Sequence, residues 1–106
     1  MFTPYSNALT AEPFEGVTRR VLAHDDDMML VEFSFKAGVE LPLHSHPHKQ
    51  ISCVVSGKME FTMGGEVFIM NPGDSMMISP DVTHGAKPLE DSVVVDIFSP
   101  ARKDFL

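Results

Sequence analysis

The sequence predicts an all-β protein, an antiparallel sandwich or jelly-roll barrel of short strands. No window of the 106 residues keeps a helical hydrophobic period over three turns. Instead, about eight to ten short segments have strand-like patterns, and turn-forming Gly, Pro, Asn and Asp residues separate them. We expect residues 1–106 to form a single domain, because the length suits one core and no linker or repeat interrupts it.

The first part of the chain is expected to contain an arm and two strands. Residues 1–15 form an N-terminal arm, residues 17–23 a first strand, and the acidic residues 24–27 a turn. Residues 28–36 then alternate apolar and polar side chains, as a strand with one buried face does. The residues expected to face the core are Val31, Phe33 and Phe35.

The middle of the chain predicts three further strands. Residues 50–56 form a strand that Gly57 closes. The next segment, KMEFTM, alternates again and is followed by Gly64-Gly65, a two-residue hairpin signal. Residues 66–70 are therefore the returning strand of a hairpin.

The last part of the chain predicts two strands and a tail. Residues 71–74, NPGD, are a tight turn, and the strand SMMIS ends at Pro80. An apolar run at residues 92–98 is the final strand, and residues 99–106 are the tail.

Composition and charge exclude several classes of function. The formal net charge of −7 opposes a nucleic-acid partner, which would need a basic face. No apolar run approaches the roughly 20 residues of a membrane span. The N-terminus lacks the basic start and apolar stretch of a signal peptide, so we expect a cytoplasmic protein.

The stretch HSHPHKQ gathers three of the five histidines of the chain. In an extended backbone His44 and His46 point the same way, about 7 Å apart, and can converge on one metal ion. Gln50 and His48 share this parity, and His84 can complete the site from a turn between two strands. The alternative is a polar loop with scattered histidines, and spacing alone leaves both open.

A wider pattern resembles the cupin superfamily. Residues 38–57 match its first motif at every spacing, from Gly38 through HSHPHKQ to Gly57, and residues 72–85, PGDSMMISPDVTHG, match the second. The resemblance implies a double-stranded β-helix barrel that holds a divalent metal: nickel, zinc, iron or manganese. The ligands it implies are His44, His46, Gln50 and His84, with His48 as a neighbour of the site.

Gln50 departs from the glutamate that cupins of this pattern usually carry. Three neutral imidazoles and a neutral amide would leave the +2 charge of an ion uncompensated by protein. We expect such a site to be a stronger Lewis acid and anion receptor than one with a carboxylate.

The closing segment DIFSPARKDF contains a second group of candidate residues. Asp96 and Phe98 share one strand face, and Asp96 is either a buried acid near the site or the exposed end of a strand. Arg102 is either part of the site, a surface charge of the tail, or a partner of Asp96.

This segment, the glutamine and the whole length resemble one group of single-domain cupins, the pectin-degradation KdgF group. The resemblance implies that Asp96, Phe98 and Arg102 line the pocket as functional residues. The activity it implies is an isomerase-type ring opening and ketonisation of a small 4,5-unsaturated uronate released from pectin or alginate.

Two other functions stay open on the sequence. One is a metal-dependent cupin dioxygenase, and the other is a non-catalytic module that binds sugar acids. The apolar side chains of the N-terminal arm favour a homodimer if they pack on a partner, but they can equally cover their own barrel.

Overall fold

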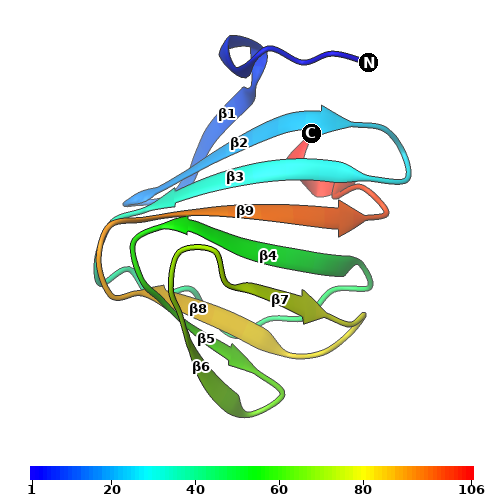
Figure 1. The fold of residues 1–106 in the computed structure, drawn as a ribbon. Helices are drawn as coiled ribbons and strands as arrows, with labels where there is room; N and C mark the ends of the chain where they lie inside the picture. Colours follow the sequence, from blue (N-terminus) through cyan, green and yellow to red (C-terminus); the bar gives the residue numbers. More distant parts are fainter.

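Two antiparallel sheets face each other in the computed structural model, which describes residues 1–106 (Figure 1). One sheet has six strands in the order β1-β2-β3-β9-β4-β7, and the other has three in the order β6-β5-β8. The strands are β1 (Leu9–Phe14), β2 (Val17–His24), β3 (Met29–Phe35), β4 (Lys49–Ser56), β5 (Met59–Met63), β6 (Glu66–Met70), β7 (Ser75–Ile78), β8 (His84–Pro88) and β9 (Ser92–Ser99). The all-β prediction is confirmed.

The two helices are single 3₁₀ turns, η1 (Tyr5–Asn7) and η2 (Lys103–Phe105). Neither has the length or the apolar character that crossing a membrane would require.

Two strands lie where the sequence patterns indicated an arm and a turn. β1 forms within the N-terminal arm and pairs only with β2, so it is an edge strand on which even Pro13 is tolerated. β8 begins at His84 and runs through Gly85 to Pro88, which have low strand propensity and no alternating pattern. Its pairing with β5 makes it a strand.

The β4–β9 register places the candidate residues of the two strands opposite each other. Gln50 pairs with Phe98, and Ser52 pairs with Asp96. These four side chains point to the inner face of the large sheet, and all four are buried.

The main hydrophobic cluster joins the two sheets. It consists of Val17, Phe35, Val54 and Val94 from the large sheet and Met59, Phe61 and Met70 from the small one. A second cluster joins strands β2, β3 and β9 of the large sheet to the C-terminal tail; it includes Val31, Phe98 and Ala101, with Phe105 of η2 packed against it. A cavity of about 390 Å³ is lined by residues of both clusters and by His44 and His84.

Gly57 lies in the turn between β4 and β5, where a side chain cannot fit. Its φ of 86° favours glycine, and a Cβ would overlap Ser92 Oγ and the Asp91 carbonyl oxygen and lie 2.7 Å from Ser92 Cα. Gly65 has a similar φ of 84°, but a Cβ there meets nothing within 4 Å.

Gly57→Ala is therefore expected to lower the free energy of unfolding by about 2–4 kcal/mol, through backbone strain and overpacking. Gly65→Ala is the matched control and should cost only about 1 kcal/mol, since it adds the strain without the overlap. Urea denaturation of both variants measures the difference. Equal losses would contradict the close approach at Gly57.

Candidate metal centre and active site

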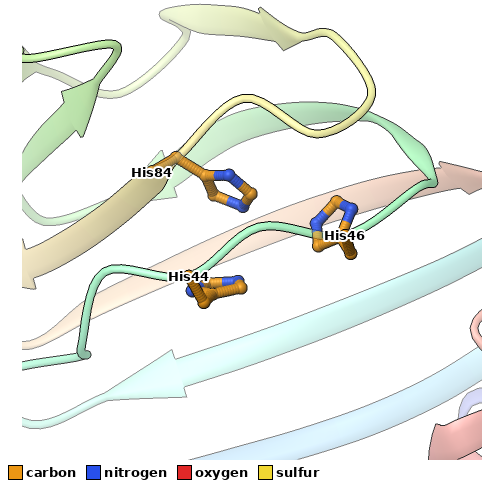
Figure 2. A group of neighbouring side chains, drawn as sticks. All are labelled: His44, His46 and His84. Atoms are coloured by element: carbon orange, nitrogen blue, oxygen red, sulfur yellow. The ribbon is translucent and has the colours of Figure 1, made fainter.

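Three histidines converge beside the cavity, and two of them, His44 and His84, line it. Figure 2 shows His84 at the start of β8 close to His44 and His46, which lie on the segment leading into β4. One ring nitrogen from each lies within 4.8 Å of the others. His44 and His84 also exchange two backbone hydrogen bonds of 2.9 Å, and this bridge holds the two segments together.

Backbone carbonyls orient all three imidazoles in the same way. His44 Nδ1 lies 3.1 Å from the Pro42 oxygen, His46 Nδ1 lies 3.0 Å from the oxygen of His48, and His84 Nδ1 lies 2.8 Å from that of Val82. Because a carbonyl can only accept, the proton of each neutral ring is on Nδ1 and the lone pair is on Nε2. Burial lowers the pKa of both His46 and His84, which favours this neutral form.

Two observations fit this site to a cation. His84 Nε2 is buried and has no hydrogen-bond partner. His46 Nε2 lies 2.9 Å from Gln50 Oε1, so two groups that can only accept face each other. A bound cation satisfies both arrangements, since it takes lone pairs from imidazole nitrogen and amide oxygen.

A hydrogen-bonded chain fixes the direction of the Gln50 amide. Gln50 Nε2 donates to Ser52 Oγ at 2.9 Å, and Ser52 Oγ donates to Asp96 Oδ1 at 2.6 Å. The carboxylate at the end can only accept when ionised, so the donors point toward it. Gln50 Oε1 is therefore directed toward the histidines.

Asp96 lies at the inner end of this chain and is buried. Burial raises the pKa of its carboxyl to about 6, against the opposing effects of the hydrogen bonds from Ser52 and Gln50 and of the charge on Arg102. Asp96 is therefore a buried acid next to the histidine site and not the exposed end of a strand.

Phe98 is buried next to the histidine segment. Its ring meets that of His46 edge-on, with centroids 5.8 Å apart, and it lines the cavity. The His48 ring lies beside both, with its centroid 5.4 Å from that of His46 and 6.5 Å from that of Phe98, and it is outside the group of three whose nitrogens converge.

Arg102 pairs with a residue that the sequence patterns did not indicate. Its Nε and Nη2 donate to the Asp104 carboxylate at 3.1 and 2.9 Å, so its partner is Asp104 and not Asp96. The guanidinium also lies 4.4 Å from the centre of the Phe105 ring and 5.1 Å from that of Phe98. Arg102 lines the cavity with its charge already balanced.

Sequence reasoning missed three residues of the site: Arg19, Ser52 and Phe105. Arg19 and Phe105 line the cavity, and Ser52 connects Gln50 to Asp96. The alternation of side chains along a strand could have indicated two of them, Arg19 and Ser52. Arg19 shares a strand face with Val17 and Val21, and Ser52 shares one with Gln50 and Val54. Because these neighbours are buried, parity predicts that Arg19 and Ser52 also point inward.

The Cupin domain family matches residues 31–98. The chain is also 38% identical over 94 residues to the pectin degradation protein KdgF of Dickeya dadantii, which covers 87% of this chain and 86% of the relative. The chain belongs to the KdgF family of cupins. Among solved structures, this cupin superimposes on KdgF from Halomonas sp. with a TM-score of 0.93 and 36% identity, covering 100% of this chain and 98% of the other. It also matches an RmlC-like cupin from Shewanella frigidimarina with a TM-score of 0.94 and 32% identity, covering 99% and 95% of the two chains.

Proposed function

We propose that this cupin is a metal-dependent isomerase that opens the ring of 4,5-unsaturated uronate monosaccharides and yields linear 5-keto acids. The relationship to KdgF, a pectin degradation protein, supports the pathway. The observation that carries the proposal is the buried Asp96, which Ser52 and Gln50 connect to His46 of the histidine group, in a cavity that Asp96, His44 and His84 line together.

The reaction rearranges bonds without adding or removing atoms. The C1 hydroxyl loses its proton as the bond from C1 to the ring oxygen breaks, which gives a C1 aldehyde and an enolate at C5. Protonation of C4 then gives the 5-keto acid. The enzyme must therefore stabilise negative charge on the C5 oxygen, remove the proton of the C1 hydroxyl and deliver a proton to C4.

His44, His46, Gln50 and His84 would hold the metal: nickel, zinc, iron or manganese. A divalent cation at this site supplies the positive charge that stabilises an enolate oxygen. All four side chains are neutral, so the protein leaves that charge available for the substrate.

Asp96 would be the general acid–base. Oδ1 accepts the hydrogen bond from Ser52, which leaves Oδ2 to exchange a proton with the C1 hydroxyl or with C4. Phe98 would pack on the sugar and exclude water. Arg102, held by Asp104 and by two aromatic rings, would orient the substrate carboxylate.

The location and assembly of the protein are part of the proposal. We propose a cytoplasmic homodimer that contacts its partner through the N-terminal arm. Phe2, Leu9 and Phe14 are each at least half exposed, which supports this contact. Tyr5 is bound to its own sheet, since its hydroxyl donates to Glu32 at 2.6 Å.

The test is an assay with freshly made 4,5-unsaturated uronate. We expect the purified protein to accelerate the loss of its ultraviolet absorbance over the spontaneous rate, without oxygen consumption, and a chelator to abolish the acceleration. Monomers from pectin and from alginate are compared side by side. Oxygen consumption would identify a dioxygenase instead, and tight uronate binding without turnover would identify a binding module.

A further inference from the structure

Arg19 is the one residue of its strand face that is not apolar. It lies on the inner face of β2 between the buried Val17 and Val21, opposite Phe33 of β3. It lines the same cavity as His84 and Asp96. Its neighbour Arg20 points to the outer face and pairs there with Glu32 at 3.5 Å.

The charge of Arg19 has no partner in the protein. None of the four ion pairs and no hydrogen bond includes it, and its Nε is buried without an acceptor. A buried donor without an acceptor costs free energy, and an anionic ligand in the cavity would supply the missing acceptor.

Phe105 holds two guanidinium groups at the cavity. The Arg19 guanidinium carbon is 4.2 Å from the centre of its ring and that of Arg102 is 4.4 Å from it. The ring stabilises both cations and fixes where they lie. Asp104 balances the charge of Arg102 and occupies its Nε and Nη2, whereas the donors of Arg19 remain free.

We propose that Arg19 is a substrate-binding residue that receives the carboxylate of the uronate and selects acids over neutral sugars. This rests on the proposed function for the identity of the ligand. In a chain with a net charge of −7, an anion needs a local cation to enter the cavity, and Arg19 is the cavity arginine with an uncompensated charge. Arg102 would then orient the same carboxylate with Nη1, the terminal nitrogen that Asp104 does not occupy, while Arg19 supplies the uncompensated charge that attracts it.

The experiment measures equilibrium binding of D-galacturonate, which has the carboxylate but no 4,5 double bond, and of its neutral methyl ester. Both are titrated by NMR into the wild type, Arg19→Gln, Arg19→Lys and the matched control Arg20→Gln. We expect Arg19→Gln to weaken galacturonate binding about 10- to 100-fold, the effect of losing hydrogen bonds to a charged group. Binding of the methyl ester should change little, Arg19→Lys should restore part of the affinity, and Arg20→Gln should match the wild type.

Three results would overturn the inference: undiminished galacturonate binding by Arg19→Gln, equal losses for acid and ester, or no galacturonate binding by the wild type. Because no turnover is needed, the outcome is separate from that of the ketonisation assay. Arg19-dependent binding without ketonisation would refute the proposed reaction and retain the carboxylate site.

Discussion

Asp96→Asn is expected to lower kcat about 10²–10⁴-fold, the usual contribution of a positioned general acid–base, and to leave the bound metal unchanged. Asparagine is close in shape to aspartate, and its Oδ1 can still accept the hydrogen bond from Ser52 Oγ. The chain that directs Gln50 Oε1 toward the histidines is thus preserved. What the amide cannot do is exchange a proton with the substrate.

Two measurements on the same preparation decide the role of Asp96. Turnover is followed by the ultraviolet assay, and metal content by elemental analysis. Unchanged turnover would rule out Asp96 as the acid–base. Loss of the metal together with turnover would instead make Asp96 a support for the Gln50 ligand.

His84→Ala is expected to remove the metal and to reduce turnover to the spontaneous rate. Hydrogen-bond partners behind a ligand are alone worth about 10–100-fold in metal affinity, so loss of a ligand should cost more than 100-fold. The bridge between residues 44 and 84 is made by backbone atoms, so alanine at position 84 can keep it. Chelation of the wild type should give the same loss of turnover.

His48→Ala is the matched control for this prediction. His48 lies next to His46 in the same segment but is outside the converging group. We expect this variant to keep its metal and most of its turnover. A comparable loss of metal in His48→Ala would make His48 a ligand.

Alternation and turn residues were sufficient to predict the strands that have one buried face. β3 and β9 show this, since Val31, Asp96 and Phe98 point inward as their parity requires. β1 and β8 could not be predicted in this way. Their residues carry no period, and they are strands because β2 and β5 supply hydrogen-bond partners.

The candidate site also has a part that the sequence could predict and a part that it could not. The resemblance to the two cupin motifs was sufficient to predict that His44, His46 and His84 lie together, and a backbone bridge between residues 44 and 84 joins the two motif segments. The partner of Arg102 depends on how the tail turns back through η2, which brings Asp104 and Phe105 to it, and no pattern in the sequence encodes that path.

The origin of the candidate ligands has a consequence for thermal stability. Gln50 belongs to the six-stranded sheet and His84 to the three-stranded one, so an ion held by both would cross-link the two sheets. Unfolding would have to release that ion, which adds about 4 kcal/mol of stability when its free concentration is 1,000 times its Kd. The order in which nickel, zinc, iron and manganese raise the melting temperature would then rank their affinities without any substrate.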